Sequence, residues 1–457
     1  MDGKVVNSTT VDGVTTYVLA DAHVHSYDTV KYDDTNHWNE CSCGEKSNVT
    51  QHDFTTSVTA PTCTANGYTT YTCECGYTKT GDETAKLGHD GKVTAAIAAS
   101  YATTGVKEYY TCSRCGEHFS DATCENSIDD LEAWKTADGL IAAQKDDAAF
   151  ANNETNPYTI ANMTDYLAFA TGEVSKKAYS QKFFKLLIDI GTESEPATVA
   201  IGSANMYFAG TLDGNGKTAY VDLNLDCAAG FVTYLAGGTV KNLTVRGSVV
   251  RNSTTSVSQV GGVVGLVTTA GGTIENCNNY AAVTTASASC AAGGIVGSVT
   301  GVATITNCNN YGNIVAENCK YVGGIVGYVV NDGTLTLTGA ENTGNVVGKT
   351  WVGGIVGLVN AKGKTQTIDT VTVKDCEIKV TKALDGTTYA SLGGVMGRSS
   401  NSDINYRNWT VTTTVKFYVA GVETDCEYTD FTTKTDGNAK PGLMFGSSKG
   451  EFTLIAD

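Results

Sequence analysis

This sequence of 457 residues is poor in proline, in charge and in residues that favour helices. It contains only 4 prolines and 17% charged residues, whereas glycine numbers 51 and threonine, valine, asparagine and tyrosine are frequent. That balance is typical of an all-β protein rich in turns. Basic residues number 31 against 48 acidic ones, which gives a net charge of -17, so we exclude nucleic acid and anionic membranes as partners.

Long hydrophobic runs are absent as well. No stretch of about eighteen apolar residues occurs, so we expect no membrane insertion. The first residues, MDGKVVNSTTVDG, show neither the basic flank nor the apolar segment of a signal peptide. The stretch TTYVLADAH at 15–23 is typical of the end of a strand, so we expect residues 1–22 to be the end of a preceding segment in a longer protein.

Histidine is missing from most of the chain. All six histidines lie at or before His118 and eight of the 15 cysteines at or before Cys124, so we place a Cys/His-rich module at 23–140. The polar stretch AAQKDDAAFANNETNP predicts a linker at 141–157, and glycine-rich repeats occupy 158–457. Because no HExxH motif accompanies the histidines, we expect no catalytic metal.

The module repeats a pair of cysteines followed by glycine, as in HWNECSCG at 37–44, YTCECG at 71–76 and YTCSRCG at 110–116. Glycine permits the tight turn that lets two thiolates converge on one ion, so we predict three structural zinc sites. The expected ligand sets are His25 or His37 with Cys41, Cys43 and His52; Cys63, Cys73, Cys75 and His89; and Cys112, Cys115, His118 and Cys124.

Disulfides are the alternative, because they form in the oxidising surroundings of a surface protein. Cys41 and Cys43 are the only cysteines before Cys63, and a bond between them would close a strained ring, so the first unit would need partners from another unit. One residue between paired cysteines is also less usual for zinc than the two residues between Cys112 and Cys115. Partly decayed sites are therefore a third interpretation.

These motifs resemble the Cys/His-rich repeats, with HWxxCxCG and YTCxxCG signatures, of long cell-surface proteins in Gram-positive anaerobes. The resemblance covers roughly residues 23–134. It implies small zinc-ribbon-like modules and a secreted or cell-surface location.

A second motif recurs beyond the linker, with GGVVG at 261, GGIVG at 293, 323 and 353, and GGVMG at 393. Spacings of 30 to 40 residues are typical of a solenoid. Two further β-prone runs, such as ATITNC and NIVAEN, lie between successive boxes, so each period supplies about three strands. Three strands and three turns form one coil of a parallel β-helix, whose coils stack about 4.8 Å apart.

Equivalent positions of stacked coils should lie above one another. NCNNY at 276–280 returns at 307–311, and a third copy runs from Ala340 to Thr343, which predicts buried small residues, asparagine ladders and stacked tyrosines. A Cys277–Cys308 disulfide is geometrically feasible, but we favour buried free thiols. For the aromatic side chains we favour ladder packing over sugar binding; they are Tyr280, Tyr311, Tyr321, Tyr328 and Trp351.

The array needs a cap at its open end. YTIANMTDYLAFATGEV at 158–174 predicts a helix capped by Asn162, and FFKLLIDI at 183–190 predicts the first strand. We expect insertions near 381–391 and 400–440 to make the carboxyl end irregular. DGNG at Asp213 is interpreted as a turn and not as a calcium loop, because too few carboxylates follow it.

Helix, strand and glycine boxes in this order resemble bacterial proteins with GLUG-type repeats, which fold as right-handed parallel β-helices. The resemblance covers about 158–400. It implies a place in surface adhesins or in large secreted proteins, including immunoglobulin A proteases. The zinc helix of those proteases has no counterpart here, since no histidine follows His118, and we do not carry that activity over.

Two functions remain. We favour a non-catalytic surface protein that presents a β-helix face to a glycan, to a host or bacterial surface protein, or to copies of itself. The alternative is a polysaccharide lyase or glycoside hydrolase of pectate-lyase-like fold, which would need clustered carboxylates and a basic residue in a groove. No column of Asp or Glu runs along the aligned glycine boxes, and arginine is rare among them.

Overall fold

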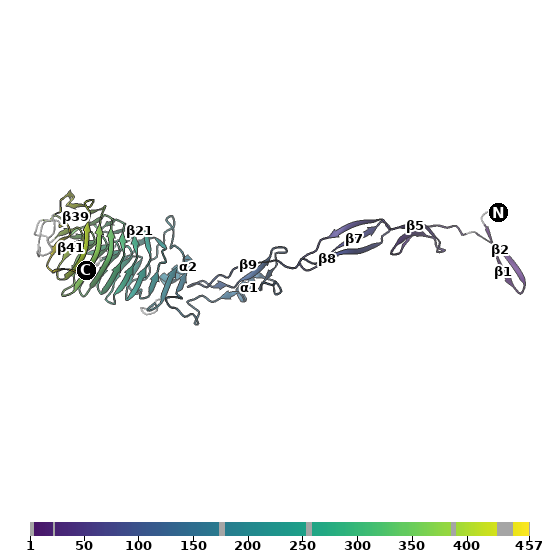
Figure 1. The fold of residues 1–457 in the computed structure, drawn as a ribbon, viewed down its shortest axis with the longest axis horizontal. Coiled ribbons are helices and arrows are strands. Elements are labelled where there is room, and N and C mark those ends of the chain that lie inside the picture. Colours follow the sequence, from purple (N-terminus) through teal and green to yellow (C-terminus); the bar gives the residue numbers. More distant parts are fainter. Residues whose placement is uncertain are drawn as a thin grey trace. The chain divides into compact units, whose positions relative to one another are not determined.

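The computed structural model describes residues 4–21, 23–172, 179–252, 258–384, 390–426 and 442–456. These residues form strands, turns and two short helices, which confirms the expected all-β class (Figure 1). The chain divides into two compact units: unit 1 comprises Met1–Ala96 and Lys107–Gly139, and unit 2 comprises Ile97–Val106 and Leu140–Asp457. Neither helix of the described chain is long and apolar enough to cross a membrane.

Unit 1 is a series of small antiparallel sheets. Its first two strands form a hairpin whose turn residues, Asp12 and Gly13, both have the positive φ that a two-residue turn of this kind requires. Two three-stranded sheets, one four-stranded sheet and a helix follow. The elements are β1 (Lys4–Val11), β2 (Val14–Asp21), β3 (Thr29–Tyr32), β4 (Asn36–Glu40), β5 (Lys46–Gln51), β6 (Phe54–Thr59), β7 (Gly67–Cys73), β8 (Thr78–Thr84), β9 (Gly91–Thr94), β11 (Tyr109–Cys112), β12 (His118–Phe119), β13 (Ser127–Ile128) and α1 (Leu131–Ala137).

Apolar burial in unit 1 is slight. All residues of β1 and β3 are exposed, and the apolar cluster of this unit consists of Cys63, Cys112, Phe119 and Cys124, with Tyr110 packed against them. Domains with so small a core need disulfides, metal ions or assembly to stay folded. Because all eight cysteines of this unit are free thiols, disulfides do not supply that stability.

Unit 2 contains three parallel sheets of 20, 7 and 5 strands. The 20-stranded sheet holds β15 (Tyr158–Ile160), β16 (Phe183–Leu186), β17 (Thr211–Asp213), β18 (Thr218–Asn224), β20 (Gly238–Lys241), β21 (Thr244–Arg251), β24 (Gly272–Glu275), β25 (Asn278–Asn279), β26 (Ala282–Thr285), β29 (Val302–Thr306), β30 (Asn309–Asn310), β31 (Ile314–Val315), β34 (Thr334–Asn342), β35 (Val346–Gly348), β38 (Thr365–Val373), β39 (Glu377–Val380), β42 (Asp403–Val411), β43 (Lys416–Val419), β44 (Val422–Glu423) and β46 (Phe452–Leu454). Within this sheet, β43 and β44 pair antiparallel.

The two smaller sheets take one strand each from successive periods of the repeat. The 7-stranded sheet holds β19 (Val232–Leu235), β23 (Val264–Val267), β28 (Val296–Val299), β33 (Val326–Val330), β37 (Val356–Asn360), β41 (Met396–Ser399) and β45 (Phe445–Ser448). The 5-stranded sheet holds β22 (Ser258–Gly261), β27 (Cys290–Gly293), β32 (Tyr321–Gly323), β36 (Trp351–Gly353) and β40 (Ser391–Gly393). A short antiparallel pair, β10 (Gly105–Val106) and β14 (Leu140–Ile141), and the helix α2 (Met163–Thr171) complete the unit.

Each glycine box lies where the chain leaves the 5-stranded sheet and enters the 7-stranded one. The first glycines of the five boxes are register partners from one period to the next. A Cβ atom at Gly293 would collide with the carbonyl oxygen of Val296, and the other first glycines face the same obstacle. Glycine therefore recurs because the backbone turns here with no room for a side chain.

In the first three of the five boxes, the second glycine makes room for a buried asparagine. A Cβ atom at Gly294 would collide with the side chain of Asn310, which is fully buried. Asn279 donates from Nδ2 to Asn310 Oδ1 at 2.8 Å, and Asn310 donates in the same way to Asn342 at 2.7 Å. The glycine boxes and the NCNNY motifs thus pack directly against each other. The asparagine ladder expected from the sequence is confirmed.

The helix expected near 158–174 is present as α2, and its N-cap Asn162 accepts a hydrogen bond from the backbone N–H of Asp165. The first parallel strand is β15, which precedes this helix, and not the Phe183 segment, which forms the second strand. With three residues, β15 is too short to show a periodic pattern. Residues 173–178, 385–389 and 427–441, which include part of the predicted helical segment and of the predicted insertions, lie outside the described residues.

Residues Ile97–Val106, which the sequence placed in the Cys/His module, belong to unit 2. Tyr101 lies in the core of this unit, and its hydroxyl is 2.9 Å from that of Tyr179. The buried carboxylate of Asp165 accepts hydrogen bonds from Ala102 N and Thr103 Oγ1 at 3.0 and 2.8 Å. These contacts bind the segment to the start of the parallel array.

Replacing Asn310 with alanine should lower the free energy of unfolding by about 2–3 kcal/mol, because buried hydrogen-bonding groups of Asn279, Asn342 and Gly312 lose a partner. Urea denaturation followed by circular dichroism measures the change. Asn309→Ala, at a partly exposed position next in sequence, is the matched control and should cost less than half as much. Equal effects at both positions would contradict a special role for the buried ladder.

Candidate metal centres

Three groups of four cysteine and histidine side chains occur in unit 1. In each group the donor atoms all lie within 4.8 Å of one another, close enough to bind one metal ion. The groups are His23, His25, Cys41 and Cys43 (centre 1); His37, His52, Cys73 and Cys75 (centre 2); and Cys63, His89, Cys112 and Cys115 (centre 3). Nitrogen and sulfur donors in sets of four suit tetrahedral transition metals.

Centre 1 joins the segment before β3 to the turn after β4. His23 Nε2 lies 2.9 Å from Cys41 Sγ, and His25 Nδ1 lies 3.3 Å from Cys43 Sγ. The turn is closed by a hydrogen bond of 2.8 Å from Gly44 N to Cys41 O, and Gly44 has a φ of 90°. Glycine after the cysteine pair is therefore required by the backbone conformation that brings the two thiols together.

Centre 2 joins two neighbouring sheets. His37 in β4 and His52 after β5 belong to the first three-stranded sheet, whereas Cys73 and Cys75 lie at the turn between β7 and β8 of the second. His37 Nδ1 lies 3.7 Å from Cys73 Sγ, and His52 Nδ1 lies 3.4 Å from Cys75 Sγ. A metal ion here would cross-link the two sheets.

Centre 3 links the second three-stranded sheet to the four-stranded sheet. Cys63, in the turn before β7, has its Sγ atom 3.8 Å from that of Cys112. His89 Nδ1 lies 3.5 Å from Cys115 Sγ. Cys112 and Cys115 flank the turn after β11, which Gly116 closes with a φ of 80°.

Four of the five clustered histidines have a partner at the ring nitrogen that faces away from the thiols. His52 Nε2 lies 2.7 Å from the carbonyl oxygen of Asp33, so this nitrogen carries the proton and Nδ1 is free to bind a metal. Nε2 of His25 lies 3.0 Å from the Glu45 carboxylate, and Nε2 of His37 lies 3.1 Å from Thr50 Oγ1. His89 Nε2 is 4.0 Å from the Glu117 carboxylate. Such partners orient metal-binding imidazoles and raise their basicity.

Backbone N–H groups favour the thiolate form of the first cysteine in each pair. The hydrogen bond from the backbone of Cys43 lowers the pKa of Cys41 to about 5, and that from Cys75 lowers the pKa of Cys73 to about 7. The backbone N–H of Asp90 lowers the pKa of Cys112 to about 5. At neutral pH the thiolate, which is the form that binds metal, therefore predominates at Cys41 and Cys112 and is partly populated at Cys73.

In centre 3, one thiol has a raised pKa instead of a lowered one. Burial, followed by the neighbouring Cys115 and Cys112 side chains, raises the pKa of Cys63 to about 11. Without a cation this sulfur stays protonated, so metal binding at centre 3 must release a proton.

The structure brings together nearly all of the predicted ligands but combines them differently. His37 and His52, expected with Cys41 and Cys43, instead face the cysteine pair at 73–75, and Cys63 and His89 face the next pair. The reason is that each cysteine pair takes its other two ligands from earlier in the chain. Sequence proximity therefore placed His25 correctly with Cys41 and Cys43, but it grouped the other ligands differently from the structure.

Two predicted ligands lie outside the three groups, and one ligand was missed. His118 in β12 has its Nδ1 atom 3.0 Å from Thr111 Oγ1 and packs against Tyr109. Cys124 is buried in the small apolar cluster of unit 1. His23 was missed, although the alternation His-x-His at 23–25 mirrors the Cys-x-Cys at 41–43 and could have indicated it.

The ligand loops of successive centres overlap along the chain. Centre 1 spans residues 23–43, centre 2 spans 37–75 and centre 3 spans 63–115, so each loop begins before the preceding one has closed. A bound metal at one centre therefore restrains part of the next. Four donors per ion leave no open position of the kind that a catalytic metal needs.

The predicted aromatic residues of unit 2 form two stacks. Tyr280 and Tyr311 stack with ring centroids 4.5 Å apart. Tyr321 stacks on Tyr328 at 4.2 Å and on Trp351 at 5.3 Å. Ladder packing is confirmed at these positions, and Tyr280 also keeps 40% of its surface exposed.

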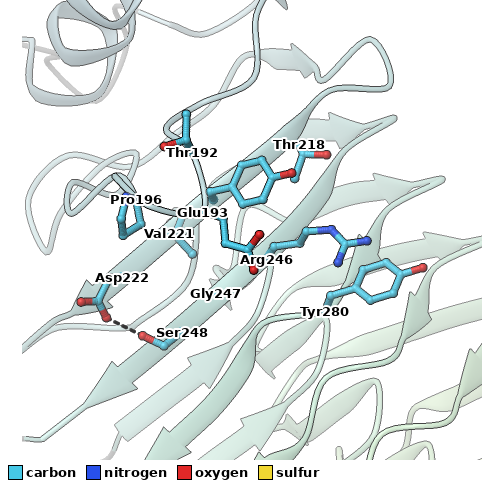
Figure 2. A pocket seen from close by; sticks show the side chains of 11 residues that line it. Thr192, Glu193, Pro196, Thr218, Val221, Asp222, Arg246, Gly247, Ser248 and Tyr280 are labelled. Carbon is cyan, nitrogen blue, oxygen red and sulfur yellow. Dashed lines mark hydrogen bonds between the residues drawn. The ribbon is translucent and has the colours of Figure 1, made fainter.

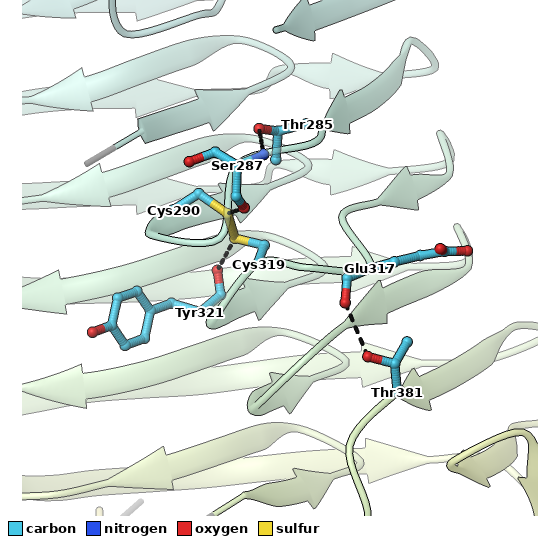
Figure 3. The surroundings of a disulfide bond; sticks show 7 residues. All are labelled: Thr285, Ser287, Cys290, Glu317, Cys319, Tyr321 and Thr381. Carbon is cyan, nitrogen blue, oxygen red and sulfur yellow. Dashed lines mark hydrogen bonds between the residues drawn. A yellow bond between two sulfur atoms is a disulfide. The ribbon is translucent and has the colours of Figure 1, made fainter. Parts of the chain in front are cut away.

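The cysteines of the array differ from expectation in one pair. Cys277 and Cys308 are buried free thiols, as favoured from the sequence. Cys290 at the start of β27 and Cys319 before β32 form a disulfide between neighbouring periods (Figure 3). The sequence did not single out this pair because Cys319 lies outside the repeated motif, in the loop that precedes the glycine box.

Replacing Cys290 and Cys319 together with alanine should lower the free energy of unfolding by about 3 to 4 kcal/mol, since the disulfide closes a loop with a sequence separation of 29 residues. Denaturation midpoints with and without reductant measure the effect. Reductant should lower the midpoint of the native chain and leave that of the double variant unchanged. An equal response of both proteins would contradict a stabilising disulfide.

The histidine arrangement predicts metal content. His52→Ala should reduce bound metal from three ions per chain to two, because it removes a ligand of centre 2. His118→Ala, which removes a histidine outside the three centres, should leave three. Elemental analysis of protein purified without chelators measures both. Loss of an ion from the His118 variant as well as from the His52 variant would instead support the ligand sets expected from the sequence, which include both histidines.

No family model matches the chain, and no curated protein matches it. Among solved structures, the chain is similar to one described as the crystal structure of a "putative immunoglobulin A1 protease" from Bacteroides ovatus, with 19% sequence identity and a TM-score of 0.47. The similarity covers 65% of this chain and 86% of that chain. A likeness at this level carries no information on activity.

Proposed function

We propose that this chain is part of a non-catalytic cell-surface or secreted protein. In this proposal a zinc-stabilised Cys/His module is joined to a right-handed parallel β-helix with GLUG-type repeats. The β-helix presents a lateral face to a glycan or to a protein on another surface. The single observation that carries the proposal is the in-register stacking of the repeats, which builds an extended surface and assembles no catalytic group at any of the repeated positions described above.

Strand register supports the β-helix. Between the glycine boxes of 293 and 323, the chain supplies strands to all three parallel sheets and then returns to the first one period later. Residues one period apart are register partners on parallel strands that pair through their backbones throughout this region. Parallel strands joined by crossovers are right-handed in nearly all proteins, which supports the proposed hand.

The donor sets support zinc. Centre 1 and centre 2 each offer two imidazoles and two thiols, and centre 3 offers one imidazole and three thiols, which are the usual ligand sets of structural zinc. A bound zinc ion would cross-link the chain and supply no chemistry beyond that. Because unit 1 has so little apolar core, binding of the ion would contribute directly to the stability of its fold.

The disulfide supports an extracellular location. Disulfides persist in secreted and surface proteins and are rare where glutathione keeps thiols reduced. The bond between Cys290 and Cys319 lies inside the array, with both cysteines fully buried. The free thiols of unit 1 fit the same location if zinc occupies them, because a bound thiolate is shielded from oxidation.

Binding without cleavage is the expected behaviour. The purified chain, applied to immobilised glycans and to surface proteins of host and bacterial origin, should be retained and should release no soluble products. Retention is read by surface plasmon resonance, and products are read by mass spectrometry of the supernatant. New oligosaccharides would instead support the alternative of a polysaccharide lyase or hydrolase. Absence of retention on every surface would contradict an adhesive role.

A further inference from the structure

One face of the 20-stranded sheet carries a column of large polar and aromatic side chains. Tyr220 in β18 and Arg246 in β21 are register partners. The backbone of Tyr280 bonds to Val245 at 2.7 Å, and that of Tyr311 bonds to Asn279 at the same distance, so both tyrosines continue the column. Four successive periods thus place long side chains at one position of the sheet.

The column is interrupted between its first two members. Arg246 lies over the ring of Tyr280, with its Cζ atom 4.1 Å from the ring centroid, and Tyr311 covers the other side of that ring. Among the described residues no aromatic ring stacks on Tyr220 and no cation lies over its ring, so its ring face is not covered by the stack. Tyr220 and Arg246 both line a hollow, in which Figure 2 shows Arg246 beside Tyr280.

This hollow is a pocket of about 570 Å³, within the range of about 300–1,000 Å³ that holds small ligands. Thr192, Glu193 and Pro196, in the loop after β16, form one wall (Figure 2). Gly247 lies at the floor with a φ of 104°, and a Cβ atom there would collide with the carbonyl oxygen of Val221. The floor is therefore backbone, and no side chain fills the space.

Several polar groups that line the pocket form no hydrogen bond or ion pair with any residue that the structure describes. The guanidinium of Arg246 forms no ion pair or hydrogen bond with any described residue, and the same holds for the carboxylate of Glu193 and the hydroxyl of Tyr220. Asp222 accepts a hydrogen bond of 2.5 Å from Ser248, which leaves its other oxygen available. Donors and acceptors thus surround the aromatic ring, all oriented by strands of the sheet or by the adjoining loop.

This combination fits the two faces of a sugar ring. The apolar C–H face of a pyranose packs against an aromatic ring, and its hydroxyl groups both donate and accept hydrogen bonds, which matches carboxylates beside a guanidinium. Two carboxylates and one cation disfavour a ligand with strong charge of either sign. The pocket chemistry therefore favours a neutral sugar over an acidic one.

We propose that the pocket between Tyr220 and Arg246 binds one neutral sugar unit of a glycan. The sugar packs on Tyr220, and its hydroxyls bond to Asp222, Glu193 and Arg246. The stacked rings of Tyr280 and Tyr311 extend the site along the sheet, so the next units of the same glycan lie over them. This inference rests on the proposed glycan-binding function and adds the site and the ligand class.

The test compares variants of the whole chain on immobilised neutral polysaccharides (xylan, galactomannan and mixed-linkage glucan) and on polygalacturonate. Tyr220→Ala and Arg246→Ala should each weaken retention on at least one neutral polysaccharide tenfold or more. Tyr418→Ala is the matched control, because Tyr418, like Tyr220, is a partly buried tyrosine of the 20-stranded sheet but lies outside the pocket. The control should bind like the native chain, and circular dichroism should show all variants folded.

The possible outcomes distinguish a failure of the proposed pocket from a failure of the proposed glycan binding. Retention of the native chain that is equal in all variants would overturn the proposed pocket and leave glycan binding standing elsewhere on the protein. A preference for polygalacturonate would overturn the neutral ligand class. Absence of retention on every glycan, in the native chain as well, would overturn glycan binding itself. Release of oligosaccharides that stops in a Glu193→Gln variant would make the pocket catalytic and contradict the binding role.

Discussion

Hydrogen bonds between equivalent positions of successive repeats are the constraint on which unit 2 depends. Strands of the three sheets pair in register with their counterparts one period away, so equivalent positions lie above one another and several of them repeat the same residue type. Glycine is then required at the first position of each box, where the backbone leaves no room for a Cβ atom, and the buried asparagines pair with one another as well as with backbone carbonyl groups. The apolar core, the aromatic stacks and the disulfide all follow this register.

Unit 1 solves the problem of stability in another way. Its strands are short and largely exposed, and its sheets are antiparallel pairs too small to form a shared core. Under the proposed function, metal ions bound to ligand groups that overlap along the chain would take the place of that core, because each group joins segments that the apolar contacts leave apart. Hydrogen bonds at Nε2 of His25 and of His52 orient the two imidazole rings, so the orientation of these rings does not depend on a bound ion alone.

Sequence patterns predicted the repeated parts well, because the same local structural requirement selects the same residue in several successive repeats. The pairing of Asn279 with Asn310 and Asn342, and the burial of Cys277 and Cys308, could be foreseen from the spacing of one motif. The metal ligands were recognisable as residue types, but their grouping was not, since His37 lies four residues before Cys41 and yet faces Cys73. Ligands that are close in sequence face one another only where the chain turns back immediately between them.

The sequence by itself determined the β-rich class, the position of the parallel array, the register of its columns and the set of residues able to bind metal. These follow from local periodicity and from the chemistry of single side chains. Only the tertiary structure decided which histidines face which cysteines, that Cys290 meets Cys319, and that a pocket lies between Tyr220 and Arg246. Such contacts depend on how far the backbone travels before it returns, and that distance is set by the packing of whole strands and loops and not by any single motif.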